Sequence, residues 1–157
     1  MDGNTGIART RYEDDTVAWA REQAAALRAR DFGAVDWTNV IEEIDDVGGS
    51  QRRSLQSALQ VIMEHLIKLD HGKQRDPERG WRVTVETQRV HADRILEDNP
   101  SLRRELPELI EKEYRRARRT AMAGFAAYEP ERLAEYEKAI SQDRTYDINA
   151  ILDENIS

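Results

Sequence analysis

The stretch from residue 36 to residue 71 constrains the fold more than any other part of the chain. Five leucine and isoleucine residues in its second half recur at alternating steps of four and three. They are Leu55, Leu59, Ile62, Leu66 and Leu69. This spacing is typical of a helix whose apolar seam packs against a partner helix.

The first half of the stretch has its own apolar pattern, which predicts a second amphipathic helix with this face turned inward. The residues of that face are Trp37, Val40, Ile41, Ile44 and Val47. Gly48 follows where a helix often ends, and Ser50 is a typical first cap of the next helix. The sequence therefore predicts two helices joined by a glycine turn at residues 48–49.

The rest of the chain also has helical spacing. We expect one helix to begin at Asp14 or Asp15 and to end before Gly33, with one apolar stripe and with Trp19 and Gln23 on a neighbouring face. The stripe consists of Val17, Ala20, Ala24 and Leu27. Further helices are expected at residues 81–97, 101–124 and 130–140, the second of them kinked or restarted at Pro107.

A last helical turn at residues 148–152 is expected to dock as a C-terminal clasp. No segment alternates like a strand. The predicted fold class is all-α, a helical bundle of four to six helices with this short C-terminal clasp. We expect residues 1–10 to form a disordered tail and residues 11–157 to form a single helical domain.

Composition limits the classes of function. The chain has 157 residues, no cysteine and a net charge of −7. The lack of cysteine excludes disulfides, thiolate metal ligands and cysteine nucleophiles, and the acidic balance argues against a nucleic-acid-binding surface over the whole protein. No run of about 20 apolar residues is present, so we expect a soluble cytoplasmic protein without a membrane span.

The acidic run at residues 42–46 raises the question of a metal site, because helical nucleotide pyrophosphohydrolases hold magnesium with a Glu-Glu-x-x-Glu run. Glu42, Glu43, Asp46 and Glu64 resemble such a set. On the predicted helices, however, Glu42 points away from the apolar face and Glu64 away from the leucine seam. Ligands of magnesium must converge, so we expect no metal site and no cofactor.

A polar cluster is the first candidate binding site. His65 falls at the edge of the leucine seam, Gln88 falls on the apolar face of the next helix, and Arg89 lies beside it, with Glu43 as a further partner. One interpretation is a pocket in which Arg89 grips an anion and His65 acts as acid, base or donor. The other interpretation is a sealed hydrogen-bond network that fixes the register of the helices.

The arginine run at residues 115–119 is a second candidate. Arg115, Arg116 and Arg119 could contact phosphates of a nucleic acid. The bases are spread around the helix, and no aromatic side chains alternate with them, so nucleic-acid binding is an alternative rather than the leading hypothesis. The tryptophans and Tyr12 and Tyr114 could anchor a protein interface if they are exposed, or else belong to the core.

Several stretches resemble the bacterial family known as domain of unknown function 29. They are Tyr12-Glu-Asp-Asp with Trp19 and Glu22-Gln23; Asn39-Val-Ile-Glu-Glu-Ile with Gly48 and Ser50; His65-Leu-Ile-Lys; Trp81 with Thr84 and Gln88-Arg89; and Asn99-Pro-Ser-Leu. The resemblance implies a small all-helical bacterial protein and implies no activity. The chain departs from the family in Val17, where an aromatic residue is common, and in the charged segment after residue 72.

The sequence favours a protein-binding or interaction module that works without catalysis and that could form a homodimer. Two alternatives stay open at this point. One is an anion- or metabolite-binding protein, or an enzyme, built on His65, Gln88 and Arg89. The other is a nucleic-acid-binding protein that uses the arginine run.

Overall fold

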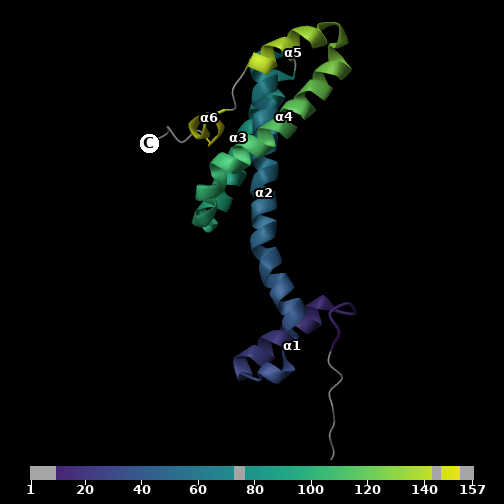
Figure 1. Ribbon diagram of the computed structural model, residues 1–157, viewed down its shortest axis with the longest axis vertical. Helices are drawn as coiled ribbons and strands as arrows, with labels where there is room; N and C mark the ends of the chain where they lie inside the picture. Colours follow the sequence, from purple (N-terminus) through teal and green to yellow (C-terminus); the bar gives the residue numbers. More distant parts are fainter. Residues whose placement is uncertain (1–9, 73–76, 143–145, 153–157) are drawn as a thin grey trace, which may run out of the picture. The chain divides into compact units, whose positions relative to one another are not determined.

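The computed structural model describes residues 10–72, 77–142 and 146–152. Within these ranges the chain forms six α-helices, three short 3₁₀ helices and no strand, which confirms the all-α prediction (Figure 1). The α-helices are α1 (Thr16–Ala29), α2 (Trp37–His71), α3 (Glu78–Asp98), α4 (Leu106–Tyr128), α5 (Leu133–Gln142) and α6 (Ile148–Leu152). The 3₁₀ helices are η1 (Phe32–Ala34), η2 (Pro100–Glu105) and η3 (Pro130–Arg132).

Two compact units divide the chain, one ending at Gly49 and one beginning at Ser50. The first unit, which we call the hairpin, contains α1, η1 and the first part of α2. The second, which we call the bundle, contains the remainder. The expected single domain stays a prediction. The expected tail of residues 1–10 lies outside the described residues except for Thr10, whose N–H and hydroxyl both donate to the carboxylate of Glu22.

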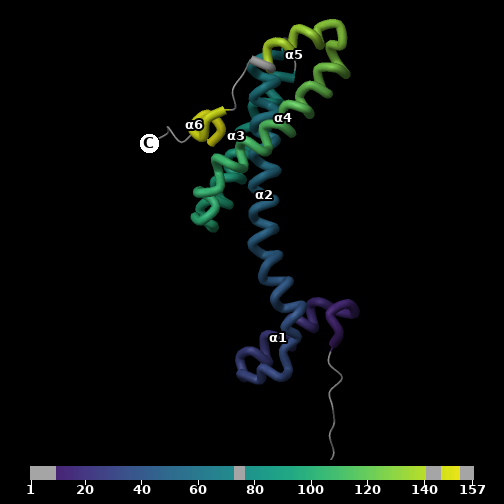
Figure 2. The backbone as a smooth tube through the Cα atoms, in the orientation of Figure 1, coloured from purple at the N-terminus to yellow at the C-terminus, as the bar shows by residue number. Residues whose placement is uncertain are grey.

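The predicted glycine turn at residues 48–49 is wrong, because Gly48 and Gly49 both lie inside α2 (Figure 2). No described glycine has a positive φ, and the left-handed cap of the hairpin is instead Arg30, with a φ of 57°. A glycine inside a helix costs roughly 1 kcal/mol relative to alanine. That cost is small beside the hydrogen bonds of a 35-residue helix, so glycine alone does not end one.

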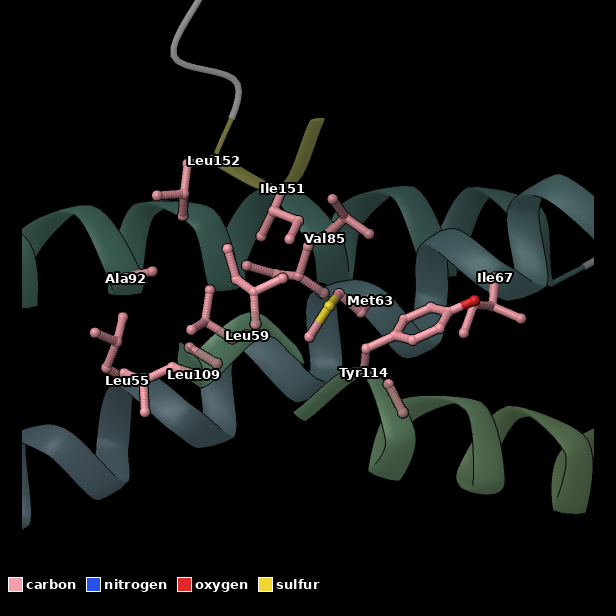
Figure 3. Packing of buried hydrophobic residues seen from close by; sticks show 14 of the residues in the cluster. Leu55, Leu59, Met63, Ile67, Val85, Ala92, Leu109, Tyr114, Ile151 and Leu152 are labelled. Atoms are coloured by element: carbon pink, nitrogen blue, oxygen red, sulfur yellow. The ribbon is translucent and has the colours of Figure 1, made fainter. Parts of the chain in front are cut away.

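The core of the bundle lies where the second part of α2 meets α3, α4 and α6 (Figure 3). Leu55, Leu59 and Ile62 of the predicted seam are fully buried, whereas Leu66 and Leu69 are only partly buried. Met63 and Ile67 take the deeper positions there. The predicted seam is therefore confirmed at Leu55, Leu59 and Ile62. Toward its end, Ile67 is buried in place of Leu66.

The clasp predicted at the C-terminal end is present. Ile151 and Leu152 of α6 are buried in the bundle core, against α3 and α4. Arg89 of α3 holds the helix from outside: its Nε donates to the carbonyl of Ile151 at 2.9 Å and its Nη2 donates to the carbonyl of Ala150 at 2.8 Å. These carbonyls end a helix and have no partner within it, so a guanidinium satisfies them well.

The core of the hairpin is much smaller. Trp19, Val35 and Val40 are its buried hydrophobic side chains, and Tyr12 and Ala26 pack against them. Helix α1 begins after Asp15, whose carboxylate accepts the N–H of Ala18 at 2.9 Å, which confirms the predicted cap. None of the helices in the described ranges has a stretch long and apolar enough to cross a bilayer.

Candidate functional site

The first part of α2 exposes the apolar side chains that the sequence analysis placed inward. Trp37 is 47% exposed, Ile41 55%, and Ile44 and Val47 66% each, so this prediction is wrong for four of the five positions. Only Val40 is buried. We call the surface formed by Trp37, Ile41, Ile44 and Val47 the α2 apolar face.

Helix α1 is turned in the same unexpected way. Trp19 and Gln23 are its buried residues, whereas Val17 is 63% exposed and Leu27 38% exposed. The apolar stripe of α1 is therefore largely exposed, and the neighbouring face with Trp19 and Gln23 is the buried one. We call the surface formed by Val17, Ala20, Ala24 and Leu27 the α1 apolar face. The face is shallow because its centre consists of two alanines.

Hydrogen bonds join α1 and the residues before it to the start of α2. The hydroxyl of Tyr12 donates to Glu43, the indole N–H of Trp19 donates to Asp36 at 3.3 Å, and the amide oxygen of Gln23 accepts the backbone N–H of Asp36 at 2.7 Å. The sequence separations of these pairs are 31, 17 and 13 residues. These bonds hold the segments of the first unit together.

Charge distinguishes the two faces. Exposed Asp45 flanks the α2 apolar face, and the chain has no basic residue from Trp37 to Gln51. Exposed Arg21 and Arg28 flank the α1 apolar face and share a shallow hollow with Val17, Ala20 and Ala24. The α2 apolar face is thus bordered by an acid and the α1 apolar face by two bases.

The hydrogen bonds that hold the hairpin also perturb two ionisable groups. The bond that Tyr12 donates to Glu43 raises the pKa of Tyr12, and nearby Glu42 and Asp46 act in the same direction. The side-chain amide of Asn39 donates to Asp36 and lowers the pKa of that carboxyl. Both groups therefore keep their ordinary charge state at neutral pH, with Asp36 ionised and Tyr12 neutral.

The residues of the predicted polar cluster have separate partners. His65 Nδ1–H donates to the carbonyl of Val61 at 2.8 Å, and Arg89 bonds to the end of α6 and to Glu86. Gln88 is half-buried and lines a surface hollow with His91 and Arg94. Glu43 belongs to the hairpin and accepts the bond from Tyr12. The guanidinium of Arg89 thus serves the clasp, and a pocket built on these four residues stays a prediction.

The arginine run lies on α4, where Arg115, Arg116 and Arg119 are exposed. Arg116 donates to both carboxylate oxygens of Glu113, at 3.0 and 2.9 Å. Glu113 is 1% exposed and also accepts a bond from Gln56. The sequence analysis missed this buried acid, although its spacing from the buried Leu109 and Ala117, four residues on either side, places it on the apolar face of α4.

Trp81 lines a surface pocket of the bundle rather than the core. The pocket has a volume of about 470 Å³, and its walls include Trp81, Phe125, Tyr128 and the side chain of Lys68. Lys68 forms an ion pair with Glu64, whose side chain is 12% exposed. Glu64 is thus largely shielded from solvent, although the sequence analysis places it on the side of the helix away from the leucine seam. Within the described residues, no three or more acidic or histidine side chains gather closely enough to hold a metal ion.

Comparison with protein families decides where the chain belongs. The family described as domain of unknown function DUF29 matches residues 11–156, which is nearly the whole chain. The chain belongs to this family. The resemblance noted in the sequence is thereby confirmed, and DUF29 membership covers the hairpin as well as the bundle. No curated protein and no solved structure matches the chain.

Proposed function

We propose that this DUF29 protein is a protein-interaction module that binds its partner through the apolar faces of the hairpin. One observation carries the proposal: four large apolar side chains of α2 are exposed on one face within eleven residues. Contiguous apolar patches are uncommon on monomeric proteins and typically mark an interaction site.

The composition of the α2 apolar face suits protein binding. Trp37 is the kind of side chain that anchors protein interfaces, and its ring lies 6.3 Å from that of exposed Phe32, centroid to centroid. Ile41 and Ile44 extend the apolar surface along the helix, and charged residues border it. An apolar centre with a polar rim is the usual plan of a protein interface.

The alternative functions have less support. Arg89 is bonded to the backbone of α6, which leaves less of its guanidinium for an anion. Arg116 is paired with a buried carboxylate, and Arg115, Arg116 and Arg119 have no aromatic platform between them for stacking bases. We place the module in the bacterial cytoplasm, on the basis of the cysteine-free composition and the family resemblance.

A photo-activated cross-linker in place of Ile44 tests the proposal. The full chain with p-benzoylphenylalanine at this position is expressed in its source organism and irradiated. We expect a discrete covalent adduct to a protein, because Ile44 lies at the centre of the α2 apolar face. Mass spectrometry of the adduct tells whether the bound protein is another copy of the chain or a different protein.

The matched control places the same cross-linker at Ala25. This residue is exposed on α1 but points away from the α1 apolar face. An adduct at position 44 and none at position 25 supports the module. Absence of an adduct at position 44, or equal adducts at both positions, contradicts it.

A further inference from the structure

We propose that the pocket of the bundle beside Trp81 binds a small organic cation with a methylated ammonium head group. The pocket has a volume of about 470 Å³, which lies within the range of small-molecule sites. Its walls include three aromatic side chains and two charged ones, those of Lys68 and Glu129. The pocket uses no residue of the hairpin, so it is a second site beside the proposed protein interface.

The ends of three helices bring these side chains together. Lys68 lies in the last turn of α2, and Trp81 lies in the first turn of α3. Phe125 and Tyr128 lie in the last turn of α4, and Glu129 follows directly. All of them belong to the bundle, so one compact unit builds the whole pocket.

The aromatic walls suit a cation. The indole of Trp81 packs on Gly72, where an added Cβ would lie 3.3 Å from two atoms of the ring. Phe125 stacks on Tyr136 with 4.1 Å between the ring centroids, and Tyr128 is 78% exposed and thus available to a ligand. The faces of such rings attract cations, and methylated ammonium ions are recurring ligands of aromatic-lined sites.

The carboxylate of Glu129 is the group that selects a cation rather than a neutral ligand. It accepts a hydrogen bond from the hydroxyl of Tyr136, which is uncharged, and it forms no ion pair within the described ranges. The pKa of Arg132 is raised chiefly by its bond to Glu135, and Glu129 contributes less. Arg132 therefore serves Glu135, and Glu129 is left as an anion in the wall of the pocket.

The charge of Lys68 already has a partner and does not favour an anionic ligand. Its Nζ forms an ion pair with Glu64, and the two side chains are only 16% and 12% exposed. Lys68, Glu64 and Glu129 together carry one positive and two negative charges, and the whole chain has a net charge of −7. An anion would have to displace Glu64 and would also be repelled by Glu129.

Nuclear magnetic resonance of the indole N–H groups tests the proposal on the full chain. Three tryptophans give three indole signals, and the signal of Trp81 is assigned by its absence in Trp81→Phe. Choline is titrated in about 0.15 M sodium chloride, so that an inorganic cation competes throughout. We expect the Trp81 signal to shift with a Kd of about 0.1–10 mM, as befits a ligand of few atoms. The signals of Trp19 and Trp37, in the hairpin, are expected to stay in place.

Two further ligands identify what the pocket recognises. The neutral isostere of choline, in which a carbon atom replaces the ammonium nitrogen, has the same shape and is expected to bind at least about fivefold more weakly. Trimethyllysine, capped at both ends as in a peptide, carries the same head group as choline. Tighter binding of choline assigns the cation to a free metabolite, and tighter binding of trimethyllysine assigns it to a modified protein side chain.

Substitutions at the pocket test the assigned residues. Tyr128→Ala and Glu129→Gln are each expected to weaken choline binding at least about threefold, and the glutamine can still accept the bond from Tyr136. Glu131→Gln is the matched control, because it removes the same charge from an exposed position outside the pocket. We expect this variant to bind like wild type, and the dispersion of the amide signals shows that each variant is folded.

Several outcomes overturn the proposal. They are a Trp81 signal that does not move up to about 50 mM choline, equal shifts of all three indole signals, and equal binding of the neutral isostere. Unchanged affinity in either pocket variant, or an equal loss in Glu131→Gln, overturns it as well. None of these outcomes bears on cross-linking at position 44, which tests the hairpin alone.

Discussion

A first prediction at the scale of single residues concerns the hydrogen bonds of Arg89. Its guanidinium bonds two terminal carbonyls of α6, and its side chain is 15% exposed. Arg89→Ala leaves these carbonyls without that donor, so we expect the free energy of unfolding to fall by about 1–3 kcal/mol. Urea denaturation measures the loss, and faster protease trimming after residue 146 locates it at α6.

Arg94→Ala is the control for this change, since it removes an exposed arginine from the same helix. Arg89→Lys is expected to recover only part of the loss, because an ammonium lacks the planar fork that reaches two carbonyls. Equal effects of Arg89→Ala and Arg94→Ala would show that the clasp does not depend on the guanidinium.

A second prediction at this scale concerns the ionisation of Tyr136. Burial and the hydrogen bond that its hydroxyl donates to Glu129 raise the pKa of Tyr136 to about 12. A pKa raised by folding means that the folded state holds the proton more tightly. The stabilisation is therefore complete below about pH 10, the ordinary pKa of tyrosine, and is lost as the pH rises toward 12.

Absorbance of tyrosinate at 295 nm checks this prediction. The pKa of Tyr12 is raised as well, and the wild-type chain is expected to show a late step near pH 12, or together with alkaline unfolding, that belongs to Tyr136. Tyr136→Phe removes that late step, whereas Tyr128→Phe, at a 78% exposed position, keeps it. A late step that survives Tyr136→Phe contradicts the assignment.

The role of an individual residue could be predicted where its local sequence context determines its hydrogen bonds. Asp15 caps α1 as expected, because a carboxylate before an apolar run has one favourable place. Glu113 was missed, because an acid on an apolar face is buried only when donors reach it, and one of its donors, Gln56, comes from another helix. The role of Arg89 was missed for the same reason, since its partners lie 61 and 62 residues away in sequence.

At the scale of a single helix, a prediction concerns the effect of Gly48 on the stability of α2. Gly48 lies inside the helix, and a Cβ added there meets no atom within 4 Å. Gly48→Ala is therefore expected to raise the free energy of unfolding by roughly 0.5–1 kcal/mol, through lower backbone entropy in the unfolded chain. Thermal denaturation followed by circular dichroism measures the gain.

Gly124→Ala serves as the contrasting control. Its added Cβ would lie 3.3 Å from Lys68 Cε, so that substitution requires the lysine to move and should yield a smaller gain or a loss. A Gly48→Ala variant that is less stable than wild type would mean that this position needs the freedom of glycine, as the predicted turn required.

Most elements were predictable and their inward faces less so. Periodicity located α3, α4 and the start of the leucine seam, because each has one dominant apolar stripe. Helix α1 and the first part of α2 have two candidate faces each, one aromatic and polar and one aliphatic. The sequence analysis assigned the aliphatic stripe of α2 inward, whereas hydrogen bonds among Trp19, Gln23 and Asp36 turn the other faces inward.

At the scale of the whole molecule, the sequence could predict an all-α chain and its family but not its division into two compact units. The boundary after Gly49 falls inside a continuous helix. The glycines at residues 48–49 mark this place in the sequence, but they predict a turn between two helices rather than a division into two compact units. The candidate binding surface was hidden for a related reason. Exposed apolar residues of a binding surface have the same helical spacing as the buried residues of a core.

The sparse core of the hairpin has a thermodynamic consequence. Trp19, Val35 and Val40 bury far less apolar surface than the interior of the bundle, so local opening of the hairpin requires less free energy than opening of the bundle. A ligand that covers the exposed faces binds the closed form and draws that equilibrium toward it. The stability of residues 10–49 and the binding of a ligand to their surface are therefore thermodynamically linked, so that a measurement of either one gives information about the other.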